Sequence, residues 1–423
     1  AEPVMVHDRS GWHRVRRISR IGLLLLLGLA IVAFLALWIW RKPIAEDLIA
    51  DELEGRGVQA TYTLDRIGLH NQRISNVVIG DPKNPDLVAD QALVQMRIKW
   101  NGSIEVYRIR ARGVRLNGTL LKDGRVSWGQ IDKLLPPPSG KPFRLPDVVL
   151  DVADATIRLD TPYGRLGFAV AGRGNLTGGF KGRMAVASRR IDIGACDVVG
   201  LKSNVAVGVV ARRPQVLGPV SAEAFNCPAS RMAMAQPRID VDSSFSEAFE
   251  TFDGKGRLAV ANFTAGDNGL ANLVANIGFK GSATDARGRF DLAAQRARLA
   301  DIFADRTRLK GTYRLEAGRG RLAVIADYGA DSASLAAPLL AGLANGLEGA
   351  AKTPIGPVAK SIAAAIRRTA RGFDADGKLV LVNFPGGGGV RIESADVRSP
   401  AGARVRVAGR DGINYYWPSG RIR

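Results

Sequence analysis

The most constraining feature of the chain is an unbroken run of uncharged residues near its N-terminus. From Ile21 to Trp40 the sequence reads IGLLLLLGLAIVAFLALWIW, twenty residues, which is the length that a helix needs to cross a hydrocarbon core. A cleaved signal peptide has a shorter apolar stretch, about 7 to 15 residues, that ends at a small-x-small site. This run ends in Leu-Trp-Ile-Trp instead, so we predict a retained single-pass anchor over residues 21–40.

The residues on either side of this run predict its orientation. Basic residues gather before it, and tryptophans, which favour the membrane interface, close it. The predicted membrane-interface residues are Arg14, Arg16, Arg17, Arg20, Trp38 and Trp40. Because the basic side of a span normally stays in the cytoplasm, residues 1–20 should form a cytoplasmic tail and the chain after residue 42 should be exported. No second run of this kind occurs, which argues against a polytopic channel or transporter.

Composition limits what the exported body can be. The chain has 423 residues, 46% of them hydrophobic, with 49 glycines and only 6% aromatic residues. These values favour short elements joined by many turns around an aliphatic core, in more than one compact unit. The net charge of +20 is scattered along the chain, which fits solubility at least as well as contact with anionic lipid. Nucleic-acid modules cluster basic residues beside exposed aromatic ones, and we find no such cluster, so no nucleic acid is expected.

Apolar residues alternate with polar ones through most of the body, which is typical of strands with one apolar face. We expect an N-terminal α+β module over residues 43–135, a proline-rich linker or crossover over 136–146, and antiparallel β-structure over 147–331 and 372–423. Turn signals lie at Asp123-Gly124, Asp253-Gly254 and Asp376-Gly377. The alternating apolar residues are Val94, Met96, Ile98 and Trp100; Val114, Leu116 and Leu120; Ala155, Ile157 and Leu159; Leu273, Ala275, Ile277 and Phe279; and Ala403, Val405 and Val407.

One segment, residues 332–371, departs from this pattern. It is rich in alanine, and Leu335, Leu339, Leu343 and Leu347 recur at fourfold spacing, which predicts two short helices split at 353–357. These helices could cap a sheet, lie on a membrane surface or pack as a hairpin, and simple packing is the favoured interpretation.

Nothing in the exported body resembles an enzyme active site. His7 and His13 fall in the predicted tail, which leaves His70 alone and rules out the usual histidine-based triads and metal clusters. The glycines from Gly386 to Gly389 lack the lysine and hydroxyl residue of a phosphate loop and predict a hairpin turn. Cys196 and Cys227 could form one disulfide or remain two separate buried thiols. We therefore expect neither catalysis nor a cofactor or metal.

Two neighbouring segments resemble a known family. Residues 113–135 read GVRLNGTLLKDGRVSWGQIDKLL and residues 144–164 read RLPDVVLDVADATIRLDTPYG, both similar to the N-terminal region of AsmA-like proteins. The later part, with its alanine-rich insert and Tyr415-Tyr416-Trp417, resembles the YdbH-like branch. This resemblance implies a bridge-like protein of Gram-negative bacteria, anchored in the inner membrane, that moves phospholipid through the periplasm toward the outer membrane along a β-groove. It also implies a small outer-membrane lipoprotein and a periplasmic accessory protein as partners, and no catalytic residues.

The alternating strands fit this expectation independently, because a sheet curled into a groove can offer its apolar face to acyl chains. The fold predicted is therefore mainly β, with one transmembrane helix, an elongated antiparallel sheet curled into a groove and a short helical hairpin. Bridging members of the family extend well past such an end, so we expect a piece of a longer protein. Candidate lining residues are Val94, Met96, Ile98, Val114, Leu116, Ile157, Leu159, Ile277 and Phe279.

Other interpretations remain open at this point. Each candidate lining residue could equally belong to an ordinary core between two layers. An envelope assembly or structural factor would use exposed strand edges to bind outer-membrane proteins. A role in dicarboxylate transport fits less well, because an apolar face is a poor site for a dianion.

Overall fold

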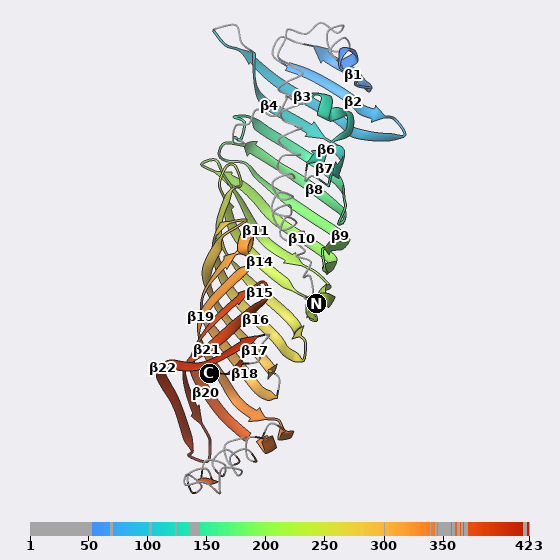
Figure 1. Ribbon diagram of the computed structural model, residues 1–423. Helices are drawn as coiled ribbons and strands as arrows, with labels where there is room; N and C mark the ends of the chain where they lie inside the picture. The colour runs from blue at the N-terminus through green and yellow to red at the C-terminus, as the bar shows by residue number, and fades with distance from the viewer. Residues whose placement is uncertain are drawn as a thin grey trace, which may run out of the picture. The chain divides into compact units, whose positions relative to one another are not determined.

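The structure is a computed structural model that describes residues 53–67, 71–100, 104–122, 125–134, 144–299, 301–338, 371–417 and 421–422, with a few residues between 340 and 367. The predicted anchor, its flanking residues, His70 and most of the proline-rich segment lie outside these residues. Within the described part, the longest helices are too short or too polar to cross a membrane. The described residues are mainly β-strand, as predicted, and the strands pair mostly antiparallel with their sequence neighbours (Figure 1).

The chain divides into two compact units. Unit 1 consists of Ala1–Ala222 and Asp240–Gly254. Its elements are β1 (Ala60–Ile67), β2 (Asn71–Asp81), β3 (Asn84–Ile98), β4 (Ile104–Arg112), β5 (Arg115–Leu120), β6 (Val126–Ser127), the 3₁₀ helix η1 (Gly129–Leu134), β7 (Val149–Thr161), β8 (Gly164–Asn175), β9 (Lys181–Ile193), β10 (Cys196–Val210), β11 (Arg213–Ser221) and most of β14 (Arg238–Phe245).

Unit 2 consists of Glu223–Ile239 and Lys255–Arg423. Its strands β16 to β23 pair in sequence order, each antiparallel to the next. The elements are β12 (Ala224–Cys227), η2 (Pro228–Ser230), β13 (Met232–Ala235), most of β15 (Thr251–Ala265), β16 (Asn268–Ser282), β17 (Ala286–Leu299), β18 (Ile302–Glu316), η3 (Ala317–Arg319), β19 (Arg321–Leu335), β20 (Arg371–Phe384), β21 (Gly387–Arg398), β22 (Arg404–Trp417) and β23 (Arg421–Ile422).

One strand of unit 1 breaks the antiparallel rule. Strand β7 pairs parallel with both β4 and β5, and antiparallel with β8. Parallel neighbours cannot be joined by a tight hairpin. The connection between β5 and β7 is therefore a crossover, while the role expected for the proline-rich segment, most of which lies outside the described residues, stays a prediction.

Two predicted turns were wrong. Asp253-Gly254 lies inside β15, and Asp376-Gly377 lies inside β20. In β20 the glycine is needed for space, because a Cβ atom at Gly377 would come 2.0 Å from the carbonyl oxygen of Ser394 on β21 and 2.8 Å from Cε1 of Tyr328 on β19. The Asp-Gly pair there serves cross-strand packing and not chain reversal. The hairpin predicted at the polyglycine run is confirmed, since β20 ends at Phe384 and β21 begins at Gly387.

Two further expectations need correction. Trp100 follows the end of β3 and is 99% exposed, so it does not continue the apolar face of that strand. The segment predicted as helical from residue 332 begins later, because β19 runs to Leu335 and Ser334 pairs with Arg371 on β20. Pairing on both edges holds these residues in the strand despite their helix-favouring composition. The residues described between 337 and 367 are helical.

Candidate functional site: two apolar faces

The apolar face of unit 1 is a closed core. The candidate lining residues of this unit are each 4% exposed or less: Val94, Met96, Val114, Leu116, Ile157 and Leu159. They share one hydrophobic cluster with Trp128, Ile131 and Leu134, which are 1% exposed or fully buried. The side chain of Ile98 lies outside the described residues. In unit 1 the alternation therefore builds a buried core, and the segment following β6 packs into it.

This segment contains Ser127 and Trp128 and belongs to residues 113–135, which resemble AsmA-like proteins. We call it the Ser-Trp signature. Polar contacts hold it in place. Asp132 accepts hydrogen bonds from the Trp128 backbone N–H, at 3.0 and 3.1 Å, and from the Ser127 hydroxyl at 2.6 Å. The Trp128 ring lies over β5, where a Cβ atom on Gly118 would come 2.6 Å from the indole. Asp86, near the start of β3, accepts a hydrogen bond from the Gln130 backbone N–H at 2.8 Å. These contacts hold Trp128 and η1 against β3 and β5.

The apolar face of unit 2 is partly exposed. Ile277 opposes Phe290, and the same cross-strand row continues through Gly311, Ala326, Leu379 and Ile392, from β16 to β21. All the larger side chains of this row are partly exposed. We call the following set the apolar face of unit 2: Ala275, Ile277, Phe279, Phe290, Leu292, Leu309, Tyr313, Val324, Ala326, Tyr328, Leu379, Leu381, Val390 and Ile392.

This face has little core of its own. The buried clusters of unit 2 are small: one contains Val260, Leu273 and Ala294, and the other contains Ala297, Ala304 and Ala333. A contiguous apolar face that remains partly accessible marks a site for another apolar surface or ligand. Ile277 and Phe279, predicted from the sequence, belong to this face, and their neighbours on β18 to β21 were not singled out there.

The strands of unit 2 change parity at one level of the sheet. Inward-facing positions two residues apart give way to positions three apart, from Ala294 to Ala297 on β17 and from the partly buried Ala330 to Ala333 on β19. Arg296 and Ser332 have positive φ angles there, and the β19–β20 register shifts between Ala330 and Ala333. Bulges increase local twist and bend a strand. Bends at a shared level of neighbouring strands are a means of curling a sheet.

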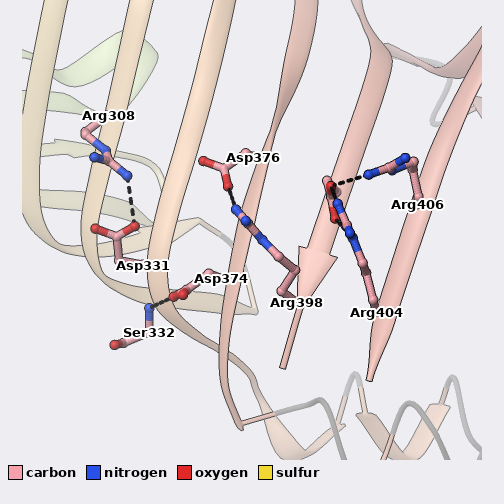
Figure 2. A network of polar contacts seen from close by, with 9 residues as sticks. Arg308, Asp331, Ser332, Asp374, Asp376, Arg398, Arg404 and Arg406 are labelled. Atoms are coloured by element: carbon pink, nitrogen blue, oxygen red, sulfur yellow. Dashed lines mark hydrogen bonds and ion pairs between the residues drawn. The ribbon is translucent and has the colours of Figure 1, made fainter. Parts of the chain in front are cut away.

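The opposite face of unit 2 is charged and paired across the strands (Figure 2). Arg308 on β18 contacts Asp331 on β19 at 3.0 Å, and Asp374 on β20 accepts from the Ser332 backbone N–H at 3.0 Å. Arg398 on β21 pairs with Asp376 on β20. Contacts of this kind join each strand from β18 to β21 to the next, on the face away from Ile277.

Among the described residues, a large pKa shift belongs to Asp396, at the end of this series of cross-strand contacts. Asp396 on β21 accepts from Nε of Arg404 at 2.8 Å and from Arg406 at 3.2 Å, both on β22. The hydrogen bond from Arg404 holds the pKa of the Asp396 carboxyl well below its usual range, and the same contact raises the pKa of Arg404. Asp376 and Asp396 directly oppose each other, so each needs its arginine to offset the repulsion.

The remaining candidate chemistry is limited. Neither Cys196 nor Cys227 carries a free thiol. In the part of the chain that the structure describes, no three His, Cys, Asp or Glu side chains come close enough together to hold a metal ion. The basic and aromatic residues predicted at the membrane interface fall outside it.

Comparisons with known proteins agree with the apolar-face geometry. Neither the curated proteins nor the solved structures contain a significant match to the chain. The model of the YdbH-like family, described as intermembrane phospholipid transport protein YdbH, matches residues 29–402. Because this match covers most of the 423 residues, the chain belongs to the YdbH-like family.

Proposed function

We propose that this protein carries phospholipid between the two membranes of a Gram-negative envelope, with the acyl chains lying on the apolar face of unit 2. The observation that carries the proposal is the row from Ile277 to Ile392, which crosses six strands and whose larger side chains stay partly exposed. Removing about ten methylene groups from water contributes about 8 kcal/mol, enough to hold a lipid chain without any polar contact. The family description supports phospholipid as the cargo.

The two faces of the unit 2 sheet suit different surroundings. Lys310 pairs with Asp291 at 3.7 Å and Lys378 with Asp327 at 3.9 Å on the charged face, which can remain in water. Aligned bends would curl the sheet around its apolar face and form the predicted groove. In this proposal the lipid headgroup stays in solvent. The acyl chains lie along rows of apolar side chains that run from strand to strand, such as the row from Ile277 to Ile392.

We assign the core of unit 1 to structure and not to lipid binding. Its candidate residues are buried in one cluster with Trp128 and η1 and leave no apolar face accessible there. Residues 21–40 would anchor the chain in the inner membrane, with the body in the periplasm. The protein would act passively, with no catalytic step, and the lipoprotein and accessory partners implied by the resemblance would complete the path to the outer membrane.

The test is photo-crosslinking of the full chain, with a matched pair of positions. A photoreactive residue replaces either Ile277, on the apolar face, or Ile325, which is 57% exposed on the charged face of β19. Phospholipid should be crosslinked at position 277 and not at 325, and detergent-purified protein should contain phospholipid by mass spectrometry. Protein adducts at 277 without lipid would overturn the proposal and favour an assembly factor.

A further inference from the structure

Two tyrosines on the apolar face of unit 2 lie along the sheet. Tyr313 on β18 passes over Gly288 of β17, and its hydroxyl donates to the backbone carbonyl of Gly278 on β16 at 3.2 Å. Tyr328 on β19, the neighbour of β18, extends across the sheet away from Tyr313. It passes over Gly377 of β20 and donates to the carbonyl of Ser394 on β21 at 3.3 Å.

The two glycines make this arrangement possible. A Cβ atom at Gly288 would lie 3.0 Å from Cε1 of Tyr313, and one at Gly377 would lie 2.7 Å from the hydroxyl oxygen of Tyr328. A side chain at either position would meet a backbone carbonyl oxygen first, that of Gly278 at 1.7 Å or that of Ser394 at 2.0 Å, and the tyrosine next. Glycine therefore serves both the close strand packing and the ring that lies over it. Each tyrosine thus spans three strands, and together they connect β16 through β21 on one face.

Both tyrosine hydroxyls donate to backbone carbonyls of the same sheet, so the face presents their rings and not their hydroxyls to a ligand. Each phenol satisfies a backbone carbonyl that glycine would otherwise leave accessible. Burial raises the pKa of both phenols, so they stay neutral at physiological pH. Between the tyrosines the cross-strand pair is Gly311 and Ala326, and Phe290 contacts Tyr313 with ring centroids 6.5 Å apart.

We propose that Tyr313 and Tyr328, laid over Gly288 and Gly377, form a bed for the acyl chains of the lipid. The rings supply flat apolar surface, and their hydroxyls are bonded to backbone carbonyls of the sheet. This inference rests on the proposed function and assigns it specific residues. Covering a glycine with an aromatic ring also stabilises a sheet by itself. The test must therefore detect contact with lipid and not stability alone.

The experiment is tyrosine nitration of the full chain with tetranitromethane, mapped by mass spectrometry. It compares protein purified with its lipid and the same protein after delipidation. We expect lipid to slow nitration of Tyr313 and Tyr328 several-fold and to leave Tyr163, in a turn of unit 1, unchanged. Equal nitration of Tyr313 and Tyr328 in the two samples, with lipid present in the first, would overturn the proposal that these tyrosines contact the acyl chains. A chain that contains no lipid would contradict the proposed function itself.

Variants provide a second readout. Tyr313→Phe and Tyr328→Phe keep the rings and should retain phospholipid after purification. Tyr313→Ser and Tyr328→Ser remove the rings and should lose lipid several-fold. Lipid retention by folded serine variants, verified by circular dichroism, would also overturn the proposal. Should a serine variant fail to fold, the nitration comparison on the unmodified protein still decides.

Discussion

The two units use the same strand alternation to different ends. In unit 1 the apolar face meets Trp128, Ile131 and Leu134 and is closed from solvent. In unit 2 the equivalent face carries Ile277, Phe290 and their neighbours without comparable cover among the described residues, and its buried clusters are small. Alternation alone therefore predicts which side chains share a face. Whether that face becomes core or binding surface depends on what the chain lays over it.

The largest expected contrast comes from placing the same charge on each face. Ile157→Arg puts an unpaired charge between Leu116 and Phe168 in the closed core, which should cost well over about 3 kcal/mol and unfold unit 1. Ile277→Arg should leave the protein folded, because its side chain can reach solvent, and should abolish phospholipid binding. Thermal unfolding and lipid mass spectrometry on both variants measure the two effects. Unfolding by both would show that unit 2 also has a closed core.

The Ser-Trp signature can be tested through its central residue. Trp128→Ala leaves a cavity over Gly118 and should lower the free energy of unfolding by about 3–5 kcal/mol, measured by denaturant titration. Trp100→Ala is the matched control, since this tryptophan is 99% exposed, and should change stability by less than about 0.5 kcal/mol. Similar losses in both variants would mean that Trp128 does not close the core.

Disulfide formation is a third test. Since neither cysteine is free and the chain has two, we propose that Cys196 and Cys227 pair with each other. Proteolysis without reductant should release their two peptides as one linked species, and reduction should destabilise the chain by about 2–4 kcal/mol. Recovery of two unlinked, alkylatable peptides from unreduced protein would exclude the bond.

The sequence predicted the strands better than the site. Alternation placed Val94, Leu116, Ile157 and Ile277 correctly on apolar faces, because a period of two determines the face in any strand. It could not distinguish core from exposed surface, because the cover of unit 1 depends on a crossover and on the contacts of Asp132. The Ser-Trp segment was recognised only as part of a family resemblance.

A glycine also explains the turn that was wrongly predicted at Asp376-Gly377. Asp376-Gly377 has the composition of a turn, yet a Cβ atom at Gly377 would meet the carbonyl oxygen of Ser394 on β21 at 2.0 Å and the ring of Tyr328 on β19 at 2.8 Å. That requirement comes from the two neighbouring strands, as the β19–β20 and β20–β21 registers show. Local turn preferences contain no information on it. Likewise, the two tyrosines carry no signal in sequence, since their role depends on carbonyls two strands away.

The smallest effect should come from the charged face of unit 2, and it sharpens the contrast with the core of unit 1. The pKa of Asp396 is lowered mainly by its hydrogen bond from Arg404, so the ionised form stabilises the β21–β22 pair. A lowered carboxyl pKa contributes stability that is present above the unfolded value, about 3.9, and is lost as pH falls through the lower folded value. The protection of β21 and β22 amides, which is their exchange rate relative to the intrinsic rate at the same pH, should therefore fall below about pH 4 in the unmodified protein. Asp396→Asn should show faster exchange already at neutral pH and less change on acidification, whereas an identical pH dependence in both proteins would show that this ion pair does not hold the two strands together.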